Sequence, residues 1–329
     1  MPLLVELPEA GNKLRTKFNN DLPYEHIFRK PESLGDFVSN GFAANDQFPS
    51  TLDGDPVIKT FNNFTINAGH TVIPINRCKG MYLFIEGDLI VNGLLSMTAR
   101  GANAPGKFIG IDYRNSIIYY AISNIFTTYP NISTISPEGG SGGTSSTTVS
   151  NHGGVGINGA CGGGGAGQHR PTNRAARGGY GRAGTSFSGG PGGGGASDNA
   201  GKEAIVNGGA GGAGGFGNYI NAGCGGAGNP AGAGGGSSYY TRGNPGANGT
   251  GGLIILIVKG SVLFGPSGQI ISAGSNGGSK SGCTSGGGSG GGAIHLFHKG
   301  DISNPEKITA PGGTGGRSGG NGSIHLNKI

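Results

Sequence analysis

The sequence has little of what builds a conventional globular core or an active site. It contains no tryptophan and only four cysteines, and aromatic and charged residues make up 7% and 12% of its 329 residues. No stretch approaches the roughly 18 apolar residues of a membrane-spanning helix. The start lacks the basic and apolar regions of a secretory signal. We therefore expect a chain that folds in a cytoplasm and does not insert into a membrane.

The four cysteines, Cys78, Cys161, Cys224 and Cys283, lie far apart, and no two are spaced as Cys-x-x-Cys. Zinc sites need closely spaced ligand pairs, and disulfide-stabilised scaffolds are short and rich in cysteine. We interpret these residues as packed free thiols. A disulfide between two of them would need a geometry that the sequence does not supply.

Glycine, in contrast, accounts for 76 residues, whereas it usually makes up about 7% of a chain. One glycine tract follows another between Gly139 and Gly252. Collagen needs glycine at every third position and proline near 15–20%, but proline numbers only 17 and the period drifts. Disorder is a second option. A flexible linker is monotonous in Gly and Ser, however, whereas aromatic residues such as Phe216 and Tyr219 interrupt these tracts.

We favour a third interpretation, in which the tracts form stacked polyglycine II helices. Such helices are extended, have three residues per turn and rise about 3.1 Å per residue. Faces without side chains let neighbouring backbones approach closely enough for N–H···O and Cα–H···O bonds. Tracts 208–215 and 223–228 have glycine at two of every three positions, and 286–292 is compatible with the same packing.

Strand-like segments flank these tracts and repeat along the chain. Residues 81–93 have the pattern of two short strands separated by a charged residue and Gly, and a third strand follows at 94–99. Matching copies begin at Ile254, Ile294 and Ile324, which are 40 and 30 residues apart. Such a unit cannot bury its apolar face alone, so it is expected to stack on its neighbours.

The fold class that follows is all-β: short-strand β-solenoid or sandwich repeats with a glycine-rich insertion that forms a polyglycine II bundle. The expected organisation is an N-terminal docking segment at 1–60, a first β-repeat at 61–101, a glycine-rich insertion with variable tips at 102–252, and further β-repeats with glycine-rich connections at 253–329. Within the first segment, residues 34–38 carry a weak helical signal.

Several motifs suggest chemistry but fail on context. Residues 154–159 match the dinucleotide-binding pattern by letters, but four glycines follow where a helix is required. Residues 177–182 resemble an RGG-type RNA contact, although most tracts contain no arginine. His295 and His325 occupy equivalent repeat positions, so a ladder would hold them about 4.8 Å apart. An outward polar ladder is the more common outcome than a metal site.

Glycoside hydrolysis normally requires two carboxylates that flank the scissile bond. From Gly139 onward the acidic residues are Asp198, Glu203, Asp301 and Glu306, and they form no evident constellation. We therefore expect no enzymatic activity, no cofactor, no metal and no nucleic-acid partner. The formal net charge is +6, and residues 139–252 hold six basic against two acidic side chains. Such a surface favours anionic partners.

The segment 64–102 resembles glycine-rich tail-fibre and receptor-binding proteins of tailed phages. The resemblance rests on Thr-Ile-Asn-Ala-Gly at 65–69, Cys-Lys-Gly-Met-Tyr at 78–82 and Glu-Gly-Asp-Leu-Ile-Val-Asn-Gly at 86–93. The tracts between Gly139 and Gly292 resemble the distal adhesins of T-even-like phages. In that family, stacked polyglycine II helices carry variable loops that contact the host receptor. The repeated β-strands depart from that pattern, so whether this chain caps a fibre or is itself the fibre stays open.

The resemblance implies a phage tail-tip adhesin, located in the virion, that recognises a host surface glycan or outer-surface protein. Its further partners would be other tail-fibre or baseplate proteins, with a homotrimer as one option. Aromatic rings would stack on sugar or apolar faces and guanidinium groups would pair with phosphate or carboxylate. The expected receptor-binding residues are Tyr180, Tyr219, Tyr239, Tyr240, Arg170, Arg174, Arg182 and Arg242. A structural appendage or coat protein and a polysaccharide depolymerase are the alternatives.

Overall fold

The protein is built almost entirely from short β-strands. The computed structural model describes residues 32–103, 141, 143, 151–156, 161–167, 181–184, 187–195, 210–212, 214, 222–234 and 242–329. Within these ranges, helical structure is confined to the four-residue helix α3 (Ala43–Asp46) and the 3-10 turn η1 (Pro305–Lys307). The prediction of an all-β protein is confirmed.

The strands form three sheets, all of them parallel. The first sheet consists of β3 (Val57–Phe61), β6 (Met81–Ile85), β9 (Leu253–Val258), β12 (Ala293–His298) and β14 (Ser323–Lys328). The second consists of β1 (Phe37–Val38), β4 (Phe64–Ile66), β7 (Leu89–Val91) and β10 (Val262–Phe264). The third consists of β2 (Gln47–Phe48), β5 (Thr71–Pro74), β8 (Leu94–Ser96), β11 (Gln269–Ile271) and β13 (Ile308–Thr309).

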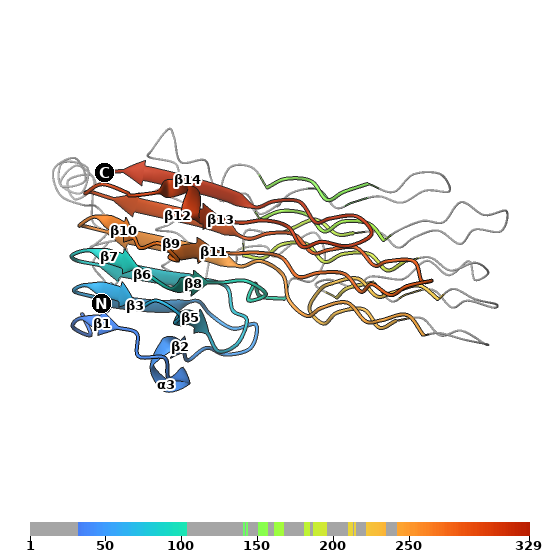
Figure 1. Ribbon diagram of the computed structural model, residues 1–329, viewed down its shortest axis with the longest axis horizontal. Coiled ribbons are helices and arrows are strands. Elements are labelled where there is room, and N and C mark those ends of the chain that lie inside the picture. Colours follow the sequence, from blue (N-terminus) through green and yellow to red (C-terminus); the bar gives the residue numbers. More distant parts are fainter. Residues whose placement is uncertain are drawn as a thin grey trace, which may run out of the picture.

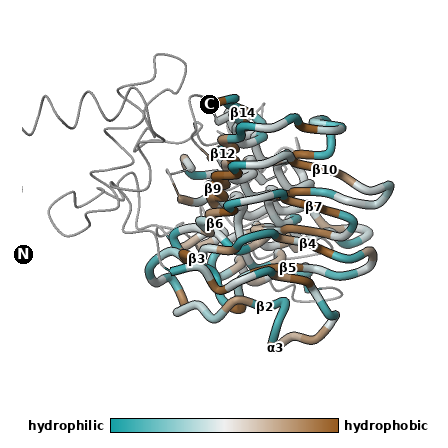
Figure 2. The backbone as a smooth tube through the Cα atoms, turned by 90° about the vertical axis from the view of Figure 1, so that its left-hand side faces the viewer, coloured by the Kyte–Doolittle hydropathy of each residue, from teal (hydrophilic) through white to brown (hydrophobic). Residues whose placement is uncertain are grey.

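Successive strands visit the three sheets in turn. β3, β4 and β5 lie in the first, second and third sheet, and the next two sets of three strands repeat that order. The rows stack from β2 and α3 at one end to β14 at the other (Figure 2). β1, β2 and most of β3 precede residue 61, where the sequence predicts the first β-repeat, and they pair with later strands of the same sheets.

The predicted alignment of the repeats is confirmed by the strand register. Ile254 of β9 is opposite Met81 of β6 on one side and Ile294 of β12 on the other, and Ile294 is opposite Ile324. β6 and β9 are therefore direct neighbours although a long glycine-rich stretch separates them in sequence. Both ends of that stretch are anchored in the same three sheets.

The charged residue and Gly between the first two strands of each repeat also stack in register. The N–H of Gly260 donates to Gly87 O at 2.9 Å, and the N–H of Gly300 donates to Gly260 O at 2.8 Å. An ion pair of 2.6 Å joins Lys259 Nζ to Glu86 Oε2 across the same turn. Repetition of this dipeptide thus sets the corner between the first and second sheets.

The weak helical signal at 34–38 is wrong, because Phe37 and Val38 form strand β1 and pair with Phe64 and Thr65. The Phe37 ring stacks on Phe64 with centroids 4.3 Å apart, and Phe61 packs 5.3 Å from it. This long-range aromatic packing, which no local pattern encodes, holds the segment extended.

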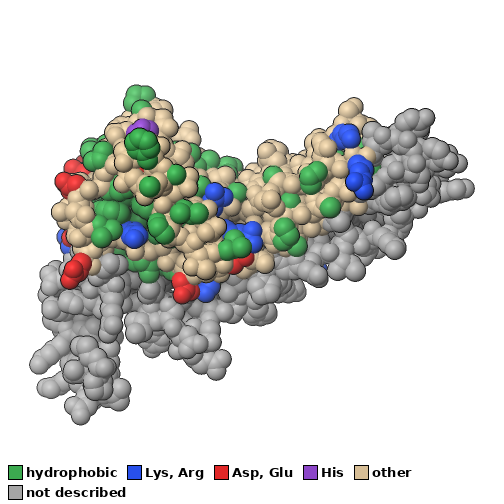
Figure 3. All heavy atoms as spheres, turned by 90° about the horizontal axis from the view of Figure 1, so that it is seen from below, with side chains coloured by type: hydrophobic (Ala, Val, Ile, Leu, Met, Phe, Trp, Pro, Cys, Tyr) green, Lys and Arg blue, Asp and Glu red, His purple; other side chains and the backbone are tan. Residues whose placement is uncertain are grey.

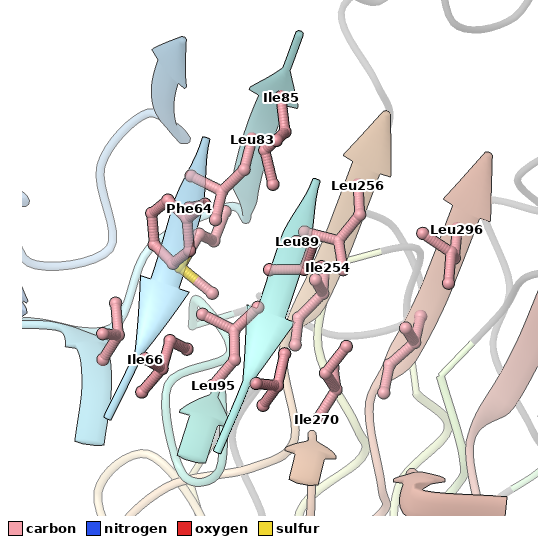
Figure 4. Close-up of a cluster of buried hydrophobic side chains, with 14 of the residues drawn as sticks. Phe64, Ile66, Leu83, Ile85, Leu89, Leu95, Ile254, Leu256, Ile270 and Leu296 are labelled. Atoms are coloured by element: carbon pink, nitrogen blue, oxygen red, sulfur yellow. The ribbon is translucent and has the colours of Figure 1, made fainter. Parts of the chain in front are cut away.

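The core lies between the three sheets and is made of aligned apolar ladders. Leu83, Leu256 and Leu296 are register partners on adjacent strands, and all three are buried (Figure 4). Alternate residues of the same strands, such as Ile255 and Phe297, point the other way and are buried too. Burial on both faces is typical of parallel sheets. Beyond the strands, the glycine tracts extend side by side away from the sheets (Figure 1).

Candidate functional site

The central tract, residues 286–292, makes backbone hydrogen bonds through every one of its N–H groups. The N–H of every third residue, starting at Gly286, donates to the chain at 272–278. The N–H groups of Gly287 and Gly290 donate to carbonyl groups at 190–193. The N–H groups of Gly288 and Gly291 donate to carbonyl groups at 317–320. The N···O distances are 2.6–3.0 Å. Consecutive N–H groups thus point to three neighbours in turn, with a period of three residues.

The carbonyl groups of the central tract follow the same order. At its end, Gly292 O accepts from the N–H of Ser323 at 3.2 Å. The carbonyl groups of the other six residues, counted in steps of three from Gly286, accept hydrogen bonds from N–H groups of 313–316, then of Ala227 and Gly251, then of 162–165. These N···O distances are 2.7–3.0 Å. Neighbours from both earlier and later parts of the chain therefore surround the central tract, and all seven of its residues are buried.

Glycine is required in the central tract because the neighbouring backbones leave no room for a side chain. A Cβ on Gly287 would overlap Gly165 O, and one on Gly290 would overlap Gly162 O. Ser289 is the residue with a side chain in this tract, and its buried Oγ is fully engaged. That oxygen accepts from the N–H of Ser275 at 2.7 Å and donates to Gly249 O at 3.1 Å. The tracts are consequently packed backbone against backbone.

Six of the eight predicted receptor-binding residues lie outside the described residues: Arg170, Arg174, Tyr180, Tyr219, Tyr239 and Tyr240. The other two, Arg182 and Arg242, are exposed. They sit on different tracts. The Arg182 backbone bonds to Pro191 O at 2.9 Å and to the N–H of Gly164 at 2.8 Å, whereas Arg242 O accepts from Lys280 Nζ at 2.8 Å.

Two further basic residues, Lys280 and Arg317, were not among the predicted site residues. Both are half-buried. Among the described residues of the tracts at 141–252, 272–292 and 310–322, all charged side chains are basic: Arg182, Arg242, Lys280 and Arg317. Lys and Arg side chains mark the end of the described tracts that is far from the strands (Figure 3). The sequence signal that could have identified Lys280 and Arg317 is the positive charge of the glycine tracts beyond residue 252.

Carboxylates of the strand region, in contrast, pair with neighbouring cations. Arg77 binds both oxygens of Asp53 at 2.6 and 2.8 Å, and the N–H of Asn103 donates to Asp53 Oδ1 at 2.7 Å. Burial by itself would raise the pKa of Asp53, but these hydrogen bonds and the Arg77 charge outweigh it and lower the pKa below its ordinary value. Lys79 pairs with Asp55 at 3.0 Å in the same way. Asp53 therefore has a structural role, whereas the Asp55 side chain is 90% exposed and its pair contributes little.

The predicted pairing of the two histidines is confirmed, but the ladder is not an exposed one, because His295 is fully buried and His325 is half-buried. His295 and His325 are register partners, and their rings stack with centroids 5.1 Å apart and an angle of 11° between the planes. Burial lowers the pKa of His325 and so favours its neutral form. In the part of the chain that the structure describes, no group of three or more metal-ligating side chains occurs. The pair therefore has the geometry of a stacked ladder.

The cysteines are free thiols. Cys78, Cys161 and Cys224 are buried and Cys283 is half-buried. Burial raises the pKa of Cys78, whose Sγ donates to Gly80 O at 3.2 Å, and raises the pKa of Cys161 still further. Thiols held protonated in this way are poor nucleophiles. Cys78 and Cys161 therefore serve packing.

No described helix is long and apolar enough to cross a membrane. Comparison with known proteins gives no match to any family model, to any curated protein or to any solved structure.

Proposed function

We propose that the protein is a phage tail-tip adhesin that recognises a host cell-surface receptor, a glycan or outer-surface protein, through loops displayed on a polyglycine scaffold. The observation that carries this proposal is the three-residue alternation of hydrogen bonds in the central tract. A backbone that is bonded on all sides is stiff, and stiff scaffolds that present irregular loops are how binding loops are commonly displayed. The exposed basic side chains at the tract ends supply a chemistry for recognition.

The proposal includes a specific architecture. The three parallel sheets would constitute a β-solenoid, because successive strands visit the sheets in a fixed order and equivalent residues are in register. The glycine tracts would constitute a bundle of polyglycine II helices. A helix with three residues per turn directs successive N–H groups to three neighbours, which matches the bonding of the central tract.

In this scheme the solenoid is the base and the far ends of the tracts are the binding surface. Arg182 and Arg242 would pair with phosphate or carboxylate groups, and guanidinium groups bind such anions in bidentate geometry. Tyr180, Tyr219, Tyr239 and Tyr240 would supply apolar area at low cost in conformational entropy. The receptor class that fits is an anionic surface polymer, such as one that carries phosphate.

The test is binding of the purified full chain to immobilised lipopolysaccharide, immobilised wall teichoic acid and whole bacteria of both envelope types. The double variant Tyr239→Ala/Tyr240→Ala and the double variant Arg182→Glu/Arg242→Glu are each expected to lower affinity at least about tenfold, because interface residues of these types often contribute more than 1 kcal/mol. The matched control is Lys299→Glu/Lys328→Glu, which changes charge equally at the strand end of the molecule and should bind as the parent does.

Binding that is equal in all three variants would contradict the adhesin assignment. Absence of binding to every polymer and cell type would instead favour a structural appendage or coat protein. Release of reducing ends from a bound polysaccharide would favour the depolymerase alternative.

A further inference from the structure

Cys224 and Cys283 lie on adjacent segments of the glycine-rich region, although they are 59 positions apart in sequence. The N–H of Cys224 donates to Thr284 O at 2.8 Å, and the N–H of Thr284 donates to Ala222 O at 3.3 Å. Gly223 and Thr284 are parallel bridge partners. The backbone next to each cysteine is thus hydrogen bonded to the backbone next to the other.

This pairing of the two backbones brings the thiols close enough for Cys283 to affect the pKa of Cys224. Burial is the main cause that raises the pKa of Cys224, and the Cys283 thiol adds to the rise through its charge and a side-chain hydrogen bond. The nearby Lys280 acts in the opposite direction. Cys224 is fully buried, whereas Cys283 is half-buried and so more accessible. An accessible thiol beside a buried one is the arrangement in which an attacking and a resolving cysteine operate.

We propose that Cys224 and Cys283 are a redox-active pair that closes to a disulfide when the protein meets an oxidising small-molecule disulfide such as oxidised glutathione. The Cys283 thiolate attacks one sulfur of that molecule, which forms a mixed disulfide and releases one glutathione thiolate. Cys224 then loses its proton to solvent and attacks the Cys283 sulfur, which releases the second glutathione. Two protein thiols are oxidised by two electrons, and one oxidised glutathione is reduced to two thiols.

The other cysteines lack such a partner in the described contacts. Cys78 lies in the strand region and donates to Gly80 O, and Cys161 is fully buried next to the N–H of Ala293. The pairing is therefore specific. It is also independent of receptor recognition, because it depends only on the juxtaposition of the two thiols.

Closure would fasten the segment that carries Lys280 to the tract of Cys224. Lys280 stands three residues before Cys283 and donates to Arg242 O, and the Cys283 N–H bonds to Lys280 O at 3.1 Å. A disulfide here would hold the Lys280 turn against the tract of Cys224. A protein assembled in a reducing cytoplasm would thus gain a cross-link once it is exposed to an oxidising exterior.

The direct experiment incubates the folded full chain in excess oxidised glutathione, blocks free thiols with iodoacetamide and maps tryptic peptides by mass spectrometry. The expected product links peptide 203–242, which contains Cys224, to peptide 281–299, which contains Cys283. Cys78 and Cys161 should be recovered alkylated. A folded protein that keeps four free thiols, that carries glutathione on Cys283 without the cross-link, or that links another pair would overturn the proposal.

A second measurement compares thermal unfolding of the oxidised and reduced protein. A cross-link over this loop length is expected to raise the midpoint by about 5 °C or more. Cys283→Ser should unfold at the midpoint of the reduced parent in both conditions. An equal difference between conditions in Cys283→Ser would show that the shift does not come from this pair and would contradict the proposal.

Discussion

Gly290 shows how strictly single positions of the central tract are constrained. Its N–H donates to Gly190 O at 2.8 Å and its carbonyl accepts from the N–H of Gly251 at 3.0 Å. A Cβ here would overlap the backbone of Gly162. Because the overlapping atoms belong to a hydrogen-bonded backbone, they cannot move away as a flexible side chain would. The position accepts only glycine.

We expect Gly290→Ala to reduce the free energy of unfolding by about 2–4 kcal/mol, because overpacking of a close-packed interior displaces the surrounding backbone. Thermal unfolding followed by circular dichroism measures the change. Ser279→Ala is the matched control, since Ser279 is exposed near the end of a tract and should change stability by less than about 0.5 kcal/mol. Equal midpoints for Gly290→Ala and the parent would argue against close backbone packing.

His325 gives the protein an acid-sensitive position. Burial lowers its pKa, so in mildly acidic solution the unfolded chain binds a proton that the folded protein does not. The free energy of unfolding should therefore be constant above about pH 6.5 and decrease as the pH falls below that value. Melting temperatures between pH 5 and 8 measure this dependence. His325→Gln should flatten the decrease; a slope as steep as that of the parent would assign it to other groups.

At the scale of elements, the repeated strands could be predicted from sequence, but the first two strands, β1 and β2, could not. The copies at 81, 254, 294 and 324 were recognisable because each begins with a similar apolar segment, and in the first three a charged residue and Gly follow it. β1 and β2 have two residues each, which is too short for any period to show. They are held by pairing with β4 and β5 and by the rings around Phe37.

The glycine tracts were recognisable as a class, but their neighbours were not. Glycines carry no side chain, so nothing in residues 162–165 or 190–193 indicates that both contact the central tract. For the candidate site, sequence predicted Arg182 and Arg242 but not Lys280 or Arg317, which follow from tracts beyond residue 252. The proximity of Cys224 to Cys283 likewise depends on tract pairing, which only the three-dimensional arrangement reveals.

Asp53 joins three segments of the chain. Its carboxylate accepts hydrogen bonds from Arg77, which precedes β6, and from the N–H of Asn103, which follows β8. Its lowered pKa means that the carboxylate stabilises the fold above about pH 3.8, and that this contribution is lost as the pH falls through the folded pKa. Asp53→Asn should lower the free energy of unfolding by about 1 kcal/mol at pH 7 and have little effect near pH 3.

Urea unfolding at the two pH values measures the effect of Asp53→Asn. Asp55→Asn is the control, because the Asp55 side chain is 90% exposed and its pair with Lys79 should contribute little. If both variants lose the same stability at pH 7, the half-buried contacts of Asp53 have no special role.

At the scale of the whole molecule, the strand region and the glycine region should be comparably rigid. Every N–H of the central tract is hydrogen bonded and buried, as are those of a strand such as β9. We expect peptides that cover 286–292 to exchange amide hydrogen about as slowly as peptides that cover β9, because exchange then requires large-scale opening. Hydrogen exchange with mass spectrometry measures both. Complete exchange of 286–292 within seconds would show that the tracts are not packed.

The place of the central tract in the chain constrains how the protein is made. During synthesis, the segments at 162–165, 190–193 and 272–278 leave the ribosome before 286–292, and 313–320 follows it. The earlier segments can bond to one another, as the N–H of Gly190 does to Gly162 O at 2.8 Å, but they lack the central tract until residue 292 has emerged. Closure of the glycine region around the central tract therefore follows synthesis of its earlier neighbours, and a chain truncated before residue 286 would lack the segment that those neighbours share.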